Sequence, residues 1–173
     1  MSSTGLAAFD CEAFAAALDG CALGRRIQAH QTVPSTMTLA DDLLAAEGGD
    51  AHGTIILAES QTAGVGRRGR SWESSQGNLY FSLLWAPKPG ASPVEVLPEL
   101  VRLNLATGVA VASAVATAGY PGARIKWPND VFHGNPLRKL SGMREAAPTR
   151  TTSPLPAAPL SSPHRAVTSE LLW

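Results

Sequence analysis

The sequence predicts an α+β fold in which helices pack on a sheet, and two observations carry this prediction. Short apolar segments with the composition of strands recur at 27–33, 53–59 and 78–85, and turn-forming residues bound them. Between and after these segments, apolar residues recur at helical spacing. With 173 residues, of which 45 % are hydrophobic, the chain is long enough to form one domain with its own core.

Three helices are expected. Residues 8–18 form a short helix with apolar residues near one face. Ser35 or Thr36 is a suitable N-cap for a second helix, because its hydroxyl can accept a hydrogen bond from an amide of the first turn. The third helix runs from about residue 96 to 118, and its small apolar residues predict burial against a sheet. The residues expected to be buried in this way are Leu103, Leu105, Ala106, Val109, Ala110 and Ala114.

The last part of the chain is predicted to divide into a hairpin and a tail. Residues 123–132 form a strand that Pro128 interrupts, and 137–142 return beside it after a turn. Five of the 13 prolines lie in the remaining segment, 143–173. Because proline at this density blocks helices and interior strands, this segment is expected to be disordered. The strand that ends at Gly142 is then expected to pair on one side only.

The composition excludes several classes of protein. The formal net charge is zero, with 14 basic and 14 acidic residues, which argues against a general nucleic-acid binder. No apolar run is expected to reach the roughly 18 residues of a membrane helix. Cys11 and Cys21 are too few and too far apart for a disulfide framework, and the N-terminus lacks the basic start of a secretory signal. A cytoplasmic protein is therefore expected, and its scattered histidines predict no metal site.

A glycine- and arginine-rich stretch, GVGRRGRSW at 64–72, allows more than one interpretation. Gly64, Gly66 and Gly69 match the G-x-G-x-x-G pattern of dinucleotide-binding folds, but that pattern requires a helix next, whereas a strand is predicted here. Glycines let the backbone approach a ligand, and arginines present forked donors to phosphate or carboxylate oxygens. The stretch is therefore an anion-binding loop, a solvated basic loop or an RG-rich contact for nucleic acid.

Further motifs accompany this stretch in a fixed order. They are STM (35–37), AESQTAGVGRRGRSW (58–72), GNLYFSLLW (77–85), KWPNDV (126–131) and RKLSG (138–142). Together they resemble the catalytic domain of biotin–protein ligases. The resemblance implies the fold of the biotin/lipoate protein ligase catalytic domain, a mixed, largely antiparallel sheet packed with helices. It also implies an N-terminal extension with a short helix (1–27), a partial catalytic domain (28–142) and a proline-rich disordered tail (143–173).

The resemblance also implies a reaction and its participants. Biotin and ATP, with Mg²⁺ accompanying the ATP, would give biotinyl-5′-adenylate and pyrophosphate. A lysine of a biotin carboxyl carrier domain would then accept the biotin as an amide. Neither a nucleic acid nor a membrane is an expected partner.

Site residues follow from the resemblance residue by residue. Lys126 and Arg67 are implied as catalytic. The implied biotin-binding residues are Ser35, Thr36, Met37, Gln61, Gly64, Val65, Gly66, Arg67, Lys126 and Gly142. The implied ATP-binding residues are Arg67, Arg68, Arg70, Trp72 and Lys126. The chemistry agrees with this set, because bringing a carboxylate against a polyphosphate requires fixed positive charge where negative charges converge. Lys126 is expected at a strand end, held in place by Trp127 and Pro128.

Three departures from the family pattern keep alternatives open. Val65 stands where the family usually has arginine, and Met37 stands where asparagine is common. After RKLSG the family continues with further core strands and a small β domain, which this sequence does not show. A non-catalytic truncated fragment or isoform of such a ligase is therefore an alternative to an active enzyme. An RG-loop nucleic-acid-binding protein is the alternative from another class.

Overall fold

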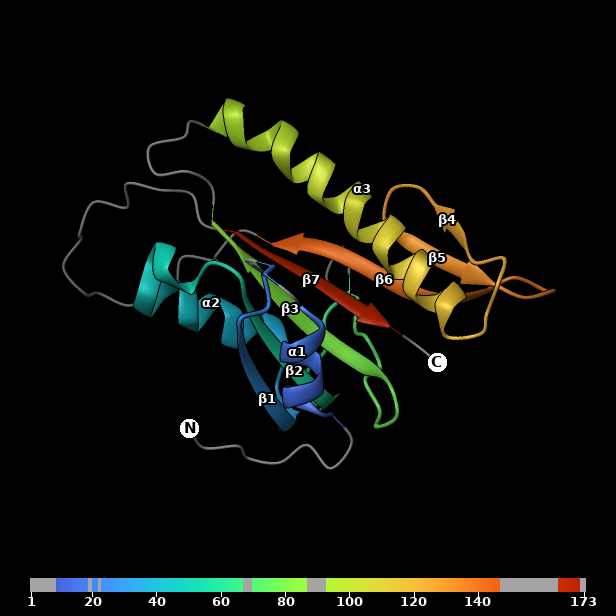
Figure 1. Ribbon diagram of the computed structural model, residues 1–173, viewed down its shortest axis with the longest axis horizontal. Helices are drawn as coiled ribbons and strands as arrows, with labels where there is room; N and C mark the ends of the chain where they lie inside the picture. Colours follow the sequence, from blue (N-terminus) through green and yellow to red (C-terminus); the bar gives the residue numbers. More distant parts are fainter. Residues whose placement is uncertain are drawn as a thin grey trace.

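The computed structural model describes residues 9–18, 20–21, 23–66, 70–86, 93–146 and 165–171. Within them the chain forms a seven-stranded sheet in the order β1-β2-β3-β7-β6-β5-β4 (Figure 1). The strands are β1 (Arg26–Val33), β2 (Thr54–Gln61), β3 (Leu79–Trp85), β4 (Arg124–Lys126), β5 (Asp130–His133), β6 (Arg138–Ala146) and β7 (Arg165–Leu171). β1 and β2 are parallel and every other neighbouring pair is antiparallel. The predicted α+β fold with a mixed, largely antiparallel sheet is confirmed.

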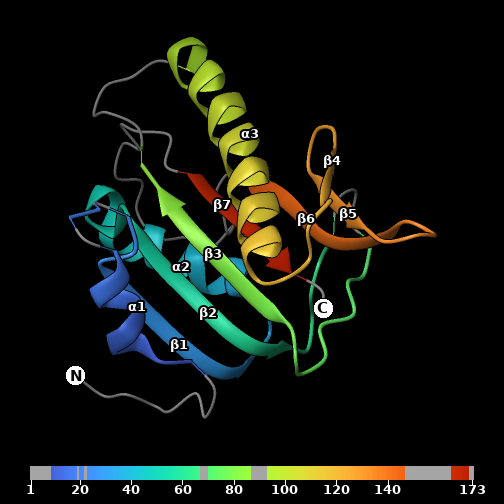
Figure 2. The same cartoon turned by 45° about the vertical axis from the view of Figure 1, so that its right-hand side comes forward.

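The helices cover both faces of this sheet. They are α1 (Cys11–Ala17), α2 (Thr36–Glu47), the short 3₁₀ helix η1 (Gly48–Ala51) and α3 (Pro93–Thr117). α2 packs on one face, whereas α1 and α3 lie on the other (Figure 2). The Ser35 hydroxyl accepts a hydrogen bond from the amide of Met37 at 3.2 Å, so the predicted N-cap of α2 is confirmed.

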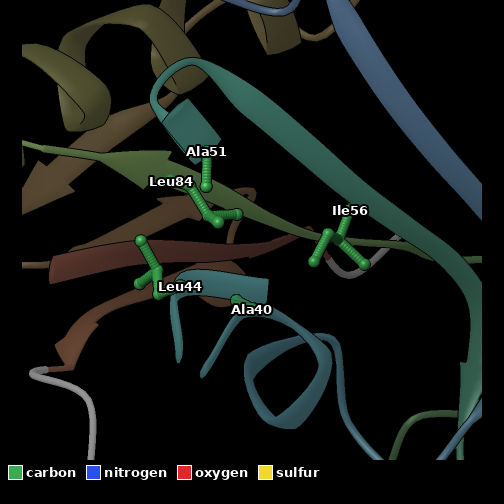
Figure 3. Close-up of a cluster of buried hydrophobic side chains, with 5 residues drawn as sticks. All are labelled: Ala40, Leu44, Ala51, Ile56 and Leu84. Atoms are coloured by element: carbon green, nitrogen blue, oxygen red, sulfur yellow. The ribbon is translucent and has the colours of Figure 1, made fainter. Parts of the chain in front are cut away.

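A cluster of buried apolar side chains packs α2 against its face of the sheet. Its members are Ala40, Leu44, Ala51, Ile56 and Leu84, each no more than 4 % exposed (Figure 3). Ile56 and Leu84 come from neighbouring strands, and alternation along a strand points both side chains to this face. α2 can bury the matching stripe because its apolar residues recur at three- and four-residue spacing.

The α3 face carries a second apolar cluster, which lies toward the C-terminal end of this helix. Val111 and Val115 of α3 pack against Val131 of β5 and Met143 of β6. The predicted burial of this helix is wrong for most of the expected residues. Leu103 is half-buried, but Leu105, Ala106, Val109, Ala110 and Ala114 are exposed. α3 is apolar on nearly all sides, so its sequence pattern does not single out the side that meets the sheet.

By length and composition α3 also meets the criterion for a membrane-spanning helix. The segment Val94–Thr117 has a mean hydropathy of 1.5 and is the one such helix among the described residues. The expectation that no apolar run reaches this length is therefore wrong by this measure. The finding is weak evidence for a membrane segment, because core helices of soluble proteins meet the same criterion.

The structure departs from the predicted tail at two places. β6 continues beyond Gly142 to Ala146, and β7 lies between β3 and β6. Disorder over the whole of 143–173 and one-sided pairing of β6 are thus both wrong. The proline argument does not reach β7, because the last proline is Pro163 and strand-compatible residues follow it. Residues 147–164 lie outside the described residues, and the division into domains at 27 and 142 stays a prediction.

Candidate functional site

The glycine-rich stretch folds back on itself after β2. Isolated antiparallel bridges join Gln61 to Ser74 and Val65 to Ser71. Two main-chain hydrogen bonds accompany these bridges. The Gly66 amide donates to the carbonyl of Arg70 at 2.7 Å, and the Trp72 amide donates to the carbonyl of Gly64 at 2.8 Å. The next regular element is β3 and not a helix. A dinucleotide-binding turn is therefore excluded, as the sequence predicted.

Gly64 is required at the base of this fold-back. A Cβ atom at this position would lie 2.5 Å from the Ser74 hydroxyl oxygen and 2.7 Å from the Trp72 carbonyl oxygen. The second contact involves backbone, which cannot simply rotate away. Gly66 is different, because its nearest contact from an added Cβ would be an ordinary 3.4 Å to the Trp72 ring. Close packing of the chain itself thus explains the glycine at 64.

Four polar side chains beneath the fold-back form what we call the buried network: Thr36, Gln61, Ser74 and Ser82. The Gln61 amide oxygen accepts from the Thr36 backbone amide at 2.8 Å and from the Thr36 hydroxyl at 3.3 Å. The Gln61 amide nitrogen donates to the Ser74 hydroxyl at 3.0 Å. The Ser82 hydroxyl donates to the Thr36 hydroxyl at 2.9 Å. Gln61 therefore satisfies an otherwise unpaired amide in the first turn of α2 and ties this helix to the fold-back.

A cleft of about 550 Å³ opens beside the buried network. Three parts of the chain line it: the fold-back, the turn between β4 and β5, and β6. The lining residues are Val65, Gly66, Arg70, Ser71, Trp72, Lys126, Trp127, Pro128, Asn129, Asp130, Lys139, Gly142, Met143 and Arg144. Gly142 is in register with Tyr80 through β7, so alternation places it on the α2 face of the sheet, as it does Ser82 of the buried network.

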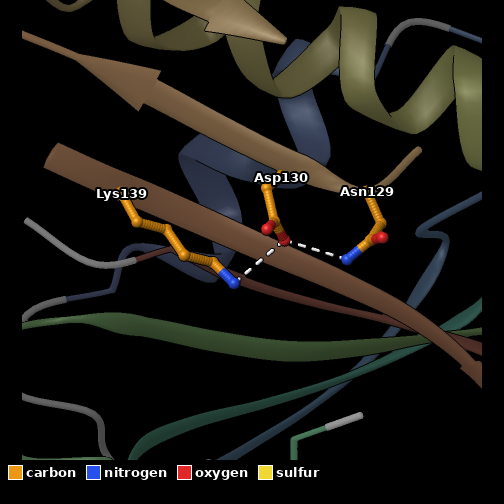
Figure 4. Close-up of polar contacts among 3 residues, drawn as sticks. All are labelled: Asn129, Asp130 and Lys139. Carbon is orange, nitrogen blue, oxygen red and sulfur yellow. Dashed lines mark hydrogen bonds and ion pairs between the residues drawn. The ribbon is translucent and has the colours of Figure 1, made fainter. Parts of the chain in front are cut away.

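An ion pair forms part of the cleft wall. The Lys139 ammonium lies 2.9 Å from a carboxylate oxygen of Asp130, and the Asn129 amide donates to the same oxygen at 2.9 Å (Figure 4). The ammonium also lies 4.7 Å from the ring centroid of Trp72, within the range of a cation–π contact. A Cβ at Gly142 would lie 2.9 Å from this ammonium. The missing side chain at 142 thus leaves room for Lys139 beneath Trp72.

Lys126 lies at the end of β4, as the sequence predicted. It is exposed and lines the cleft, and its ammonium is 5.5 Å from the ring centroid of Phe132. Trp127 was expected to hold Lys126 in place, but Trp127 is 76 % exposed. A side chain with this exposure gives Lys126 little packing support, and Trp127 instead lines the cleft.

The cleft gathers part of the predicted site. Val65, Gly66, Arg70, Trp72, Lys126 and Gly142 line it. Thr36 and Gln61 lie in the buried network, Ser35 and Met37 lie at the start of α2, and Gly64 packs against Ser74. Arg67 and Arg68 lie outside the described residues. The ligand-binding roles of all these residues stay predictions.

Four residues were missed. Ser74 and Ser82 complete the buried network, and Lys139 and Arg144 bring positive charge to the cleft. Lys139 stood within the RKLSG motif, which was a usable signal. Ser82 likewise stood within the GNLYFSLLW motif, whereas Ser74 and Arg144 lie outside the quoted motifs. Among the described residues, no group of three or more His, Cys, Asp or Glu side chains is arranged to hold a metal ion.

Comparison with known proteins gives consistent results. The model of the biotin/lipoate A/B protein ligase family matches residues 29–151. The bifunctional ligase/repressor BirA of Escherichia coli is 38 % identical over 92 residues, which are 53 % of this chain and 26 % of BirA. The biotin–protein ligase of Schizosaccharomyces pombe is 32 % identical over 150 residues, 78 % of this chain and 23 % of that protein. The chain thus spans about a quarter of the length of these two curated relatives.

A solved structure agrees with the sequence relatives. The biotin protein ligase from Aquifex aeolicus, in complex with biotin and ATP, has a TM-score of 0.61 at 28 % identity. The match covers 85 % of this chain and 52 % of that chain.

Proposed function

The chain belongs to the biotin/lipoate A/B protein ligase family, and we propose that it activates biotin with ATP and transfers the biotin to a lysine of a carrier domain. In the first step, a biotin carboxylate oxygen bonds to the α-phosphorus of ATP, and pyrophosphate leaves with the electrons of the broken P–O bond. In the second step, the lysine amine attacks the acyl carbon of biotinyl-5′-AMP. AMP leaves, and the amine loses a proton to form the amide.

The observation that carries the proposal is the positive charge of the cleft. Arg70, Lys126, Lys139 and Arg144 reach it from segments that are far apart in the sequence. Asp130 is the acidic side chain among the described lining residues, and Lys139 already pairs with it. In the first step a carboxylate must approach a triphosphate, and fixed cations lower the repulsion between them. A cleft with this charge is suited to that step.

Lys126 is the residue best suited to the reacting centre. Its side chain is exposed in the cleft, and its ammonium lies 5.5 Å from the ring centroid of Phe132. Among the described residues, neither of the two ion pairs involves Lys126. An ammonium is a compact charge that can contact a carboxylate and a phosphate oxygen together. Lys126 is therefore proposed to bridge the biotin carboxylate and the α-phosphate.

The buried network supports a biotin site next to these charges. Thr36 and Gln61 are held by hydrogen bonds in one geometry, and Ser35 caps the same helix. Polar groups that are ordered before a ligand arrives lose little entropy when they bind it. We propose that the biotin head lies by this end of α2, near Met37 and Val65, with its carboxylate directed toward Lys126.

Other participants follow from the reaction. Mg²⁺ would enter with the ATP, since magnesium in such sites is held largely by phosphates and water. The acceptor would be the lysine of a biotin carboxyl carrier domain, and the reaction would take place in the cytoplasm. Arg67 and Arg68 are proposed as further phosphate ligands, in keeping with their place in the glycine-rich stretch.

The first test is biotin-dependent exchange between ATP and labelled pyrophosphate. Lys126→Ala is expected to lower the exchange rate by about 100-fold or more, the effect of removing a group that stabilises transition-state charge. The melting temperature should not change, because Lys126 is exposed. Arg138→Ala is the matched control: Arg138 is exposed on β6 and does not line the cleft. Equal exchange by parent and Lys126→Ala would remove Lys126 from the chemistry, and no exchange by the parent would refute the proposed activation of biotin.

A further inference from the structure

We propose that Arg144 is a positioning residue of the cleft, which acts by holding the main chain of the fold-back from the opposite wall. Arg144 lies on β6, and its guanidinium donates to the carbonyl of Val65 at 2.7 Å and approaches the carbonyl of Gly66 at 3.4 Å. The contact joins residues 78 and 79 positions apart in the sequence. It also spans the cleft, since all three residues line it.

The contact lies beyond the base of the fold-back, at Val65 and Gly66. At its base, Gly64 is wedged against Ser74 and the Trp72 carbonyl. Toward its tip, the described main-chain links are the Val65–Ser71 bridge and the hydrogen bond from Gly66 to Arg70. A two-residue rung of this kind is weak by itself, because an isolated hairpin is at best marginally stable in water. A charged donor from the neighbouring sheet therefore has a large share in fixing Val65 and Gly66.

The geometry suits arginine. Its planar guanidinium can donate to two neighbouring carbonyl oxygens without losing its charge. Val65 is 40 % exposed and Gly66 is buried, so the two carbonyls lie at the border between cleft and interior. By fixing these carbonyls, Arg144 sets the position of the wall that carries Arg70 and Trp72. Arg144 also places a positive charge beside the cleft, next to Val65, whose side chain carries no charge.

The inference rests on the proposed function for the choice of ATP as ligand, but its main readout does not. That readout is hydrogen exchange of the ligand-free protein, measured at the amides of Gly66 and Trp72. Both amides donate hydrogen bonds inside the fold-back, so their exchange reports its opening. The amide of Leu57, in the interior strand β2, reports global unfolding.

Arg144→Leu should speed exchange at Gly66 and Trp72 by about tenfold, as expected when a charge-assisted hydrogen bond is lost, and should leave Leu57 unchanged. Arg144→Lys, which keeps a charged donor, should restore most of the protection. Arg138→Leu, on the same strand, should change none of the three amides. With active protein, Arg144→Leu should also raise KM for ATP about fivefold to tenfold.

Two results would overturn the inference: unchanged exchange at Gly66 and Trp72 in Arg144→Leu, or an equal acceleration at Leu57. The first would mean that the contact does not hold the fold-back, and the second that Arg144 only stabilises the fold as a whole. If Arg144→Leu speeds exchange at Gly66 and Trp72 while the parent chain shows no biotin-dependent pyrophosphate exchange, the positioning role is supported and the proposed function is refuted.

Discussion

In the buried network no side chain is more than 7 % exposed, whereas the charged side chains that line the cleft are exposed or half-buried. The two groups lie side by side on the α2 face of the sheet, and both are polar. They differ in the partners that their polar groups have available. In the buried network each hydroxyl and amide completes another, because an unpaired polar group without water is costly. In the cleft, water can take the place of a missing partner.

This difference predicts how substitutions divide between stability and activity. Changes in the buried network should destabilise the fold and thereby also disturb any ligand beside it. Changes in the cleft should alter binding or catalysis and leave stability close to that of the parent, because surface ion pairs contribute little. The following substitutions test this division, beginning with the largest expected effect on stability.

Gln61→Leu should destabilise the protein most. Leucine has a similar volume but cannot accept from the Thr36 amide or donate to Ser74, so both groups remain buried without this partner. The expected loss in the free energy of unfolding is about 2–4 kcal/mol. Urea unfolding measures it. The matched control is Gln76→Leu: Gln76 is exposed and its amide donates to Glu59 at 3.0 Å, so its loss should be within about 0.5 kcal/mol. Equal losses would show that the buried network does not differ from the surface in this respect.

Gly64→Ala tests the base of the fold-back. The added Cβ would meet the Trp72 carbonyl at 2.7 Å, which forces the main chain to shift. Overpacking of this kind costs about 1–3 kcal/mol. Gly66→Ala is the control, since its added Cβ meets nothing nearer than 3.4 Å. Thermal unfolding of the two variants should therefore separate them, and a Gly66→Ala variant as unstable as Gly64→Ala would contradict the described packing.

The sequence was sufficient where the determining contacts are local. The start of α2 was predicted because a serine hydroxyl and an amide two residues on form its cap. The hairpin from β4 to β6 was predicted from its turn residues. The family motifs also identified six residues that line one cleft. Motifs that are far apart in the chain can be recognised as a set, even though the contacts between them cannot be derived from the sequence.

The sequence does not predict contacts between residues that are far apart along the chain. Gln61 meets Thr36 across 25 residues, and Arg144 meets Val65 across 79. No local sequence pattern around these residues indicates such a contact. β7 was missed for the same reason, because a strand that is inserted between β3 and β6 is defined by its neighbours more than by its own composition. In α3 the apolar residues surround the helix, so only the position of the sheet decides which of them are buried.

Lys139→Met tests the cleft side of the comparison and should have the smallest effect on stability. The Lys139–Asp130 pair is partly exposed, with side chains 31 % and 23 % exposed, so its loss should cost less than about 1 kcal/mol. The expected effect is on ligand binding, because the carboxylate of Asp130 would then face the cleft without its countercharge and repel the phosphates of ATP. KM for ATP should rise several-fold.

The double variant Lys139→Met/Asp130→Asn distinguishes this repulsion from damage to the cleft wall. If the unpaired carboxylate causes the weaker binding, removing its charge should bring KM for ATP back toward that of the parent. Arg26→Met is the matched control, since Arg26 forms an ion pair with Glu47 at 2.6 Å at a place that does not line the cleft, and its KM should not change. A double variant with the same KM as Lys139→Met would show that Lys139 acts through its packing under Trp72, at a contact of 4.7 Å, and not through the charge of Asp130.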